Sequence, residues 1–392
     1  MVNAPESPNS GDEKRDPTLV FGTASFMNDM SSDMIAPIWP TFLYSYLGLS
    51  FLMVGFIDGL ALTITSLSKL GAGYESDRTG KRKRYITAGY FLSMISRIGF
   101  ALSSGFITIT IAKSLDRLGK MRGPPRDAMV AAHVSEERRG RAFGILRAMD
   151  SGGALVGSII TFFLFAMLGY IGIILLATIP AAISVIVIVL FIKEGRGKDV
   201  FKGVSFSGLN KNLKLFFLAS VLFALATFSY SFLILFSSPY YSLYMLPLLY
   251  ILFTLSDAAS AYPFGRASDR YGRKPILVLG FLFLALSAGW AHLATDWLSV
   301  LPMFILFGLS AGALTPVQTT LVADLVEEER RASLIGAFQM VVGIAALPAG
   351  MIIGYLWESF GSLVAFDFSL MLALIAVGFM MLIRIPKPQN RE

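Results

Sequence analysis

The segment 112–128, AKSLDRLGKMRGPPRDA, carries seven charged side chains although the chain on both sides of it is apolar. Four of these charges follow one another at the i, i+3, i+4 and i+7 spacing of related helix faces: Lys113, Asp116, Arg117 and Lys120. A charge that faces lipid at mid-membrane costs at least about 2.5–3.5 kcal/mol, so these side chains must face a polar cavity or one another. Arg117 is the candidate anchor for an anionic solute, because a guanidinium pairs bidentately with a carboxylate or a phosphate. The alternative is a self-neutralised structural network.

A second polar group lies in the segment 26–40, FMNDMSSDMIAPIWP, where Asp29 and Asp33 are one helical turn apart. Two carboxylates at that spacing in a low dielectric disfavour double ionisation, so the pair is a candidate carrier of a coupling proton. We expect either aspartate to meet Arg117 or Lys113, and a buried salt bridge without a transport role is the alternative. In the second half of the chain the expected polar contacts to a solute are Gln318, Gln339 and Asp257.

These residues must be positioned by membrane-spanning helices. The chain has 392 residues, of which 55% are hydrophobic and 15% charged, whereas soluble domains average about 25% charged residues. A helix needs about 20 mostly apolar residues to cross the hydrocarbon core. The sequence therefore predicts an all-α membrane protein with twelve spans: 18–47, 51–73, 85–104, 106–129, 142–168, 171–192, 214–237, 244–264, 275–293, 297–318, 332–356 and 362–384.

The distribution of lysine and arginine predicts the orientation of these spans. Basic residues gather in alternate connections such as 77–84 and 267–275, and the intervening connections contain none. This asymmetry is the positive-inside pattern, which indicates a cell-membrane protein with both termini in the cytoplasm. The polar segments 1–17 and 385–392 are interpreted as cytoplasmic tails, the first of them disordered. The positive charge thus reflects topology, and no nucleic-acid partner is expected.

An internal repeat divides the chain into two halves. GYESDRTGKR at 73–82 recurs as GRASDRYGRK at 265–274, an offset of 192 residues, and the same offset relates Pro124 to Pro316 and Gly144 to Gly336. The repeat predicts two homologous six-helix bundles, at 18–192 and 214–384, with 193–213 as a cytoplasmic linker. The charges of the fourth span have no charged equivalents at that offset in the tenth. A feature present in only one half favours a role with the solute or the coupling ion rather than with the fold.

The repeated G-x-x-x-D-R-x-G-[RK]-[RK] motif, together with twelve spans and two halves, resembles the major facilitator superfamily over nearly the whole chain. The resemblance implies a cytoplasmic latch that holds that side shut in the outward-open state. Its residues would be Gly73, Asp77, Arg78, Gly80 and Arg82 in the first half, and Gly265, Asp269, Arg270, Gly272 and Arg273 in the second. From their positions, both aspartates could also cap a helix start and pair with nearby arginines. Arg126 and Asp127 are expected in a gate network at the same side. Arg117 resembles a mid-membrane arginine of the family, although the continuation RLGKMRG departs from the family pattern.

Several chemistries lack the residues that they need. There is no phosphate-binding G-x-x-x-x-G-K-[ST] loop, no cysteine and only two histidines. We therefore expect no ATP-driven transport, no enzyme activity, no cofactor and no metal site. The leading hypothesis is a monomeric, proton-coupled secondary transporter of a small anionic or zwitterionic organic solute. The runner-up is a drug/proton antiporter, but SGGALVGSI at 151–159 lacks the proline of the pattern typical of such exporters. A metal-ion exporter and a non-transporting sensor are the weaker alternatives.

Overall fold

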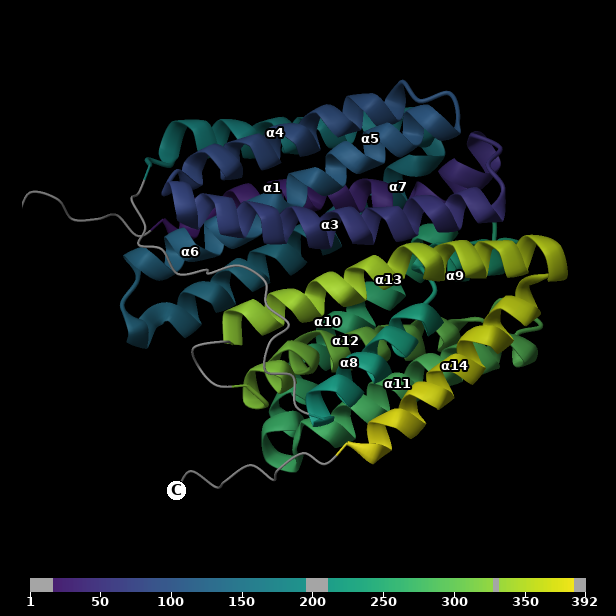
Figure 1. Ribbon diagram of the computed structural model, residues 1–392. Helices are drawn as coiled ribbons and strands as arrows, with labels where there is room; N and C mark the ends of the chain where they lie inside the picture. Colours follow the sequence, from purple (N-terminus) through teal and green to yellow (C-terminus); the bar gives the residue numbers. More distant parts are fainter. Residues whose placement is uncertain (1–16, 195–210, 327–330, 384–392) are drawn as a thin grey trace, which may run out of the picture.

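The computed structural model describes residues 17–194, 211–326 and 331–383. The expected tails 1–17 and 385–392 and the expected linker 193–213 fall largely or wholly outside these residues, so their roles stay predictions. The described chain is helical and contains no strand. Its helices form two bundles that lie side by side, one from each half of the sequence (Figure 1).

The first bundle contains the helices up to residue 191. In chain order they are α1 (Thr18–Ile35), η1 (Ala36–Ile38), α2 (Trp39–Thr41), η2 (Phe42–Tyr46), α3 (Phe51–Thr79), α4 (Arg82–Ala101), α5 (Phe106–Leu118), η3 (Gly119–Arg122), α6 (Gly123–His133) and α7 (Glu136–Phe191). The first span changes from α to 3₁₀ geometry at Ala36, where Pro37 and Pro40 remove backbone donors. The long α7 is broken at Gly169, whose φ of 62° lies in the left-handed region that glycine tolerates.

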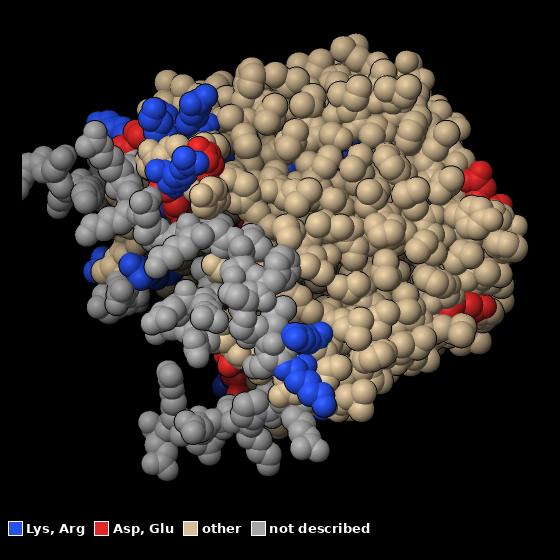
Figure 2. Space-filling view, viewed as in Figure 1, with Lys and Arg blue, Asp and Glu red and all other residues tan. Residues whose placement is uncertain are grey.

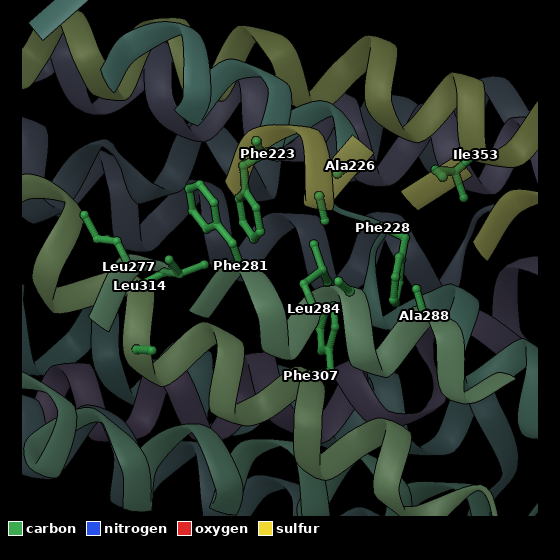
Figure 3. Packing of buried hydrophobic residues seen from close by; sticks show 14 of the residues in the cluster. Phe223, Ala226, Phe228, Leu277, Phe281, Leu284, Ala288, Phe307, Leu314 and Ile353 are labelled. Atoms are coloured by element: carbon green, nitrogen blue, oxygen red, sulfur yellow. The ribbon is translucent and has the colours of Figure 1, made fainter. Parts of the chain in front are cut away.

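The second bundle contains the helices from residue 211 onward. They are α8 (Lys211–Ala226), α9 (Tyr230–Ser237), α10 (Leu246–Tyr271), α11 (Arg273–Gly289), η4 (Trp290–Leu293), α12 (Leu301–Asp324), α13 (Arg331–Phe360) and α14 (Ser362–Leu382). Its core is aromatic: Phe223 stacks on Phe281 at 4.1 Å between ring centroids, and Phe228 stacks on Phe307 at 5.2 Å (Figure 3). This core fixes the second bundle around α8, α9, α11 and α12.

Seven helical stretches of the described chain are long and apolar enough to cross a membrane, with 138–191 counted as one although Gly169 divides it. The helices α1, α4, α5 and α10, which carry most of the charged residues discussed above, are not among the seven. The helices follow the order of the twelve predicted spans, but the number twelve stays a prediction.

The two bundles meet most closely where α3 crosses α13 (Figure 1). Gly55 and Gly59 of α3 lie directly against the backbone of Gly350 and Ala346 of α13, so a side chain at either glycine of α3 would collide with the opposite backbone. Thr63 Oγ1 donates to the carbonyl oxygen of Gly343 across the same crossing, at 2.8 Å. Small residues therefore allow the bundles to touch along a line of backbone contact.

Charged and apolar side chains are separated on the surface. Lys and Arg gather at the end of the molecule where α3 ends and α4 begins, and a wide uncharged belt follows (Figure 2). We call this end the basic end and the other the opposite end, where only acidic residues are visible in this view. The belt contains large exposed apolar side chains such as Phe163, Leu190 and Met371. An apolar belt of this kind is the surface that lipid covers.

Candidate functional site

A cavity of about 570 Å³ lies between the two bundles toward the basic end. Helices α1, α3, α6 and α7 and the 3₁₀ turn η3 of the first bundle line it, and α13 of the second bundle closes one side. Seven of the residues expected at the site or gate line this cavity: Asp29, Gly73, Asp77, Lys120, Arg126, Asp127 and Gln339. The first bundle supplies every charged residue of its lining, and the second supplies Ile335, Gly336 and Gln339.

Asp29 lies in the wall of this cavity and is held by two cations. Its Oδ1 is 3.5 Å from Lys120 Nζ and 3.9 Å from Arg122 Nη2, and Asn28 Nδ2 donates to it at 3.3 Å. Lys120 and Arg122 come from η3, the turn that interrupts the fourth span and aims both side chains at α1. The charge of Asp29 is thus neutralised by two cations of the charged segment 112–128.

Arg126 forms a second charged group next to the first. It contacts Asp127 at 2.9 Å and Asp150 of α7 at 3.5 Å, and it donates to Ser25 of α1 at 2.5 Å. The expectation that Arg126 and Asp127 belong to a network near the basic end agrees with this geometry, which extends the network to Asp150. Its action as a gate stays a proposal.

Two cations of the cavity differ from those above. Lys69 of α3 and Arg147 of α7 line the cavity, and both side chains are exposed to it. Within the described parts of the chain neither forms an ion pair or a hydrogen bond, although Asp127 lies within electrostatic range of Lys69 and Asp257 within that of Arg147. The cavity therefore offers two cations that no described carboxylate binds directly.

The deeper charges of the fourth span form a separate buried cluster. Arg97 of α4 donates to Asp116 at 2.7 Å, and Arg117 Nε lies 3.3 Å from the other oxygen of the same carboxylate. Lys113 Nζ sits 3.5 Å from the centroid of the Trp39 ring, a cation–π contact. These residues border a small cavity of about 20 Å³, roughly the room of one water molecule. These buried charges thus face one another, which is one of the two arrangements that the sequence allowed for them.

One expected contact is wrong. Neither Asp29 nor Asp33 pairs with Arg117 or Lys113, since Asp29 binds Lys120 and Arg122 while Asp33 Oδ1 accepts a hydrogen bond from Tyr250 Oη of α10 at 2.6 Å. The two aspartates share a helix face but not a partner. The reason is that the two cations have other partners, since Arg117 lies against Asp116 and Lys113 lies over the Trp39 ring.

The signature motif makes ion pairs within each bundle. In the first bundle Arg82 Nη2 binds Asp77 at 2.8 Å and Gly80 ends α3 with a φ of 66°. Gly73 packs against Pro124, and Arg78 lies 4.0 Å from Glu75. The expectation that Asp77 caps a helix start is wrong, because Asp77 lies in the last turn of α3 and α4 has no side-chain cap.

In the second bundle Arg273 binds both Asp269 and Asp324, the latter at 3.1 Å. Here too the capping role is absent, since α11 has no side-chain cap among its described residues. Gly272 has a φ of 94°, which requires glycine, whereas a side chain at Gly265 would meet open space. Arg270 lies over the ring of Tyr271, 5.3 Å from its centroid. None of the described contacts of the signature residues joins the two bundles.

Sequence reasoning did not assign the residues that complete these clusters. Arg97, Asp58 and Tyr250 are isolated polar residues in apolar runs, and only their depth in the span could have marked them as partners of other buried groups. Gln318, which was expected to contact the solute, is half-buried and does not border either cavity, and Asp257 does not border them either.

Comparison with known proteins places this geometry in a family. The family model of the Major Facilitator Superfamily matches residues 21–250 and 216–392, once for each half. The chain is 36% identical to an uncharacterised MFS-type transporter of Methanocaldococcus jannaschii, over 86% of this chain and 88% of that protein. It is 25% identical to the multi-drug resistance efflux pump PmrA of Streptococcus pneumoniae, over 77% and 79% of the two chains.

Among solved structures, a bacterial homologue of the human lysosomal transporter Spinster, in an inward-facing and occupied conformation, has a TM-score of 0.76 at 13% identity. The match covers 95% of this chain and 97% of that one, and at this identity it speaks for the fold alone. The prediction of two homologous helical halves is thereby confirmed. The protein is a multi-pass membrane protein and a transporter rather than an enzyme, and it belongs to the major facilitator superfamily.

Proposed function

We propose that the protein is a proton-coupled secondary transporter of a small anionic or zwitterionic organic solute, which it moves across the cell membrane by alternating access. Both termini and the basic end face the cytoplasm in this proposal, so the cavity is open inward. The observation that carries the proposal is the pair of cations Lys69 and Arg147, which line the cavity without a direct ion pair among the described residues.

The charge balance of the cavity supports an anionic solute. Asp29 is held by Lys120 and Arg122, and Arg126 is held by two carboxylates, so a solute carboxylate or phosphate would find Lys69 and Arg147 available. A desolvated ionic hydrogen bond is worth about 1.5–3 kcal/mol, which is enough to select an anion over a neutral analogue. Gln339 of the opposite wall offers a neutral donor and acceptor for the rest of the solute.

The two aspartates of α1 support coupling to protons. Asp29 faces the cavity and Asp33 lies one turn deeper, bound to a helix of the other bundle. A proton that enters from the cavity would reach Asp29 first, and a change at Asp33 would act directly on a contact between the bundles. The pair thus connects the solute side of α1 with the movement of the two halves.

The competing function is drug/proton antiport, and the similarity to PmrA favours it. A cavity for lipophilic cations needs apolar walls and unpaired carboxylates, whereas the carboxylates of this cavity are paired with lysine or arginine. The anionic solute is therefore the better match to the site.

The test is uptake into proteoliposomes. Carboxylates, phosphorylated solutes, neutral solutes and lipophilic cations are screened with and without a pH gradient. The variant Lys69→Gln/Arg147→Gln should raise the KM for the best anionic solute about tenfold or more, since two ionic contacts are lost. Arg84→Gln, which removes an exposed cation that does not border the cavity, serves as the control. Preferred uptake of cations, or an unchanged KM in the double variant, would refute the anionic assignment.

A further inference from the structure

The first helix of each bundle is interrupted at an equivalent place. The seventh span breaks at residues 227–229, between α8 and α9, and the first span turns from α1 into the 3₁₀ helix η1 at residues 36–38. The two sites differ by the 192-residue offset of the repeat to within one residue. A helix break leaves backbone groups without intrahelical partners and is a place where a span can bend.

The break in the second bundle is bound by a buried carboxylate of the first. Asp58 of α3 is 9% exposed, and its Oδ2 accepts hydrogen bonds from Ser229 Oγ at 2.7 Å and from Ser231 Oγ at 2.5 Å. Its Oδ1 accepts from Trp39 Nε1 at 3.1 Å. No cation pairs with Asp58 among the described residues, so three neutral donors hold this charge in place.

The break in the first bundle is bound by the second in the same manner. Tyr250 of α10 donates to Asp33 at 2.6 Å, and Tyr230 of α9 donates to the carbonyl oxygen of Ala36 at 3.2 Å. Ala36 is the first residue of η1, and Asp33 lies in the turn of α1 before it. Two tyrosine hydroxyls of the second bundle thus donate hydrogen bonds to acceptors at the break in the first span.

The two arrangements are related by the repeat. Asp58 and Tyr250 are 192 residues apart, and so are Trp39 and Ser231. Asp58 of the second span thus binds the interrupted seventh span. Tyr250, at the equivalent position in the eighth span, binds the interrupted first span. The hydrogen-bond roles are reversed between the two positions, because Asp58 accepts hydrogen bonds and Tyr250 donates one.

The position of these contacts is between the cavity and the opposite end. Asp58 lies two turns from the start of α3 and Tyr250 one turn from the start of α10, and both helices begin at the opposite end. Neither residue borders the large cavity. Phe228, the middle residue of the break in the second bundle, is buried against Phe307 and near Leu284 and Ala288 (Figure 3). The next residue, Ser229, binds Asp58 of α3.

We infer that Asp58 and Tyr250 are paired gate residues, each closing the opposite end of the transport route by holding the interrupted first span of the other bundle. The inference rests on the proposed alternating access but not on the identity of the solute or of the coupling ion. Opening of the opposite end requires release of both contacts. The carboxylates of Asp58 and Asp33 then exchange a hydroxyl donor for water, which enters as that end opens.

The experiment measures distances between spin labels in the purified protein without solute or pH gradient. Because the chain contains no cysteine, single introduced cysteines label without background. The opposite-end pair is Leu102→Cys with Leu293→Cys, and the basic-end pair is Lys81→Cys with Tyr271→Cys; all four sites are exposed and each pair has one member in each bundle.

The gate variants are Tyr250→Phe and Ser229→Ala/Ser231→Ala. Each is matched by a control that removes the same group from a contact within the second bundle: Tyr240→Phe, whose hydroxyl binds Ala294, and Ser237→Ala, whose hydroxyl binds Leu233. Loss of one hydrogen bond to a carboxylate should raise the population with a long opposite-end distance about tenfold, with shortening of the basic-end distance. The double serine variant, combined with Tyr250→Phe, should raise it further than either alone.

Distance distributions that match those of the controls would overturn the assignment of the gate. Lengthening at both ends together would overturn it too, because that result indicates loosened packing rather than an exchange of open ends. Ser229→Ala alone removes one of the two cross-bundle donors from Asp58 and supplies a milder variant if the double serine variant does not fold. A failed solute screen leaves these distances unaffected, so failure of the solute assignment and failure of the gate are distinguishable.

Discussion

Replacing Arg97 by leucine tests whether the buried charge of the fourth span is held by the fold or by the transport site. The side chains of Arg97 and Asp116 are 2% and 5% exposed, and they meet at 2.7 Å. Arg97 also donates to Ser31 and Ser32 of α1, so it joins α1, α4 and α5. Removal of the guanidinium leaves the Asp116 carboxylate in a site from which water is largely excluded.

The size of the effect follows from this burial. Removing one partner of a buried ion pair costs about 3–5 kcal/mol, because the remaining charge stays desolvated. Arg117 compensates only in part, since its Nε lies 3.3 Å from the carboxylate and its side chain is 28% exposed. We therefore expect Arg97→Leu to lower the free energy of unfolding by about 3 kcal/mol or more, and Arg117→Leu by about 1 kcal/mol.

The double variant Arg97→Leu/Asp116→Leu separates the two contributions. With neither charge present, the penalty for an unpaired carboxylate disappears, so the double variant should be more stable than Arg97→Leu alone. The assay is reversible unfolding in mixed detergent micelles, followed by circular dichroism and extrapolated linearly, with Arg84→Leu as a surface control. If Arg97→Leu costs no more than Arg117→Leu, Arg117 is the principal partner of Asp116 and the argument fails.

The other expectations concern coupling, the latch and the contact between the bundles. The double variant Asp29→Asn/Asp33→Asn should abolish gradient-driven transport and spare solute exchange. Proton release linked to solute binding, measured with a pH dye, should vanish. An unchanged number of protons released per solute would place protonation at another residue. Asp77→Asn should weaken the closed cytoplasmic latch and lengthen the basic-end distance, and the latch assignment fails if that distribution is unchanged. Gly350→Leu should destabilise the protein by about 1–3 kcal/mol or more in thermal unfolding because its side chain would collide with the backbone of α3, whereas Gly378→Leu, which meets open space, should be nearly neutral.

The sequence was sufficient to predict the fold because the fold is repeated. A motif that returns after 192 residues, with charges confined to alternate connections, admits few arrangements other than two similar helical bundles. Apolar length was a weaker guide, since α1, α4 and α10 carry charged side chains and fall below the apolarity that a simple span requires. The helices that are most informative about the site are therefore the least visible to hydropathy.

The sequence was less sufficient for the site because partners there come from different spans. The charge pattern of the fourth span predicted that its charges would face a cavity or one another, and in the structure Arg117 lies against Asp116 and Arg126 against Asp127. Spacing could not indicate that Arg97 of the neighbouring helix would take Asp116 first, or that a tyrosine of the other bundle would take Asp33. Such contacts depend on the rotation of each helix about its axis, which a single sequence leaves open.

The two kinds of buried carboxylate in this protein suggest how rigidity and movement are divided. Asp116 is bound by a guanidinium of its own bundle, and separating that pair would cost several kcal/mol, so we expect it to stay intact throughout the proposed transport cycle. Asp58 and Asp33 reach across to the other bundle and are bound there by hydroxyl groups alone. A hydroxyl can be exchanged for water at a cost of about 0–2 kcal/mol, because water offers the same donor. We therefore expect ion pairs within a bundle to preserve its shape and neutral donors between the bundles to keep the contact reversible, which is the division that the proposed alternating access requires.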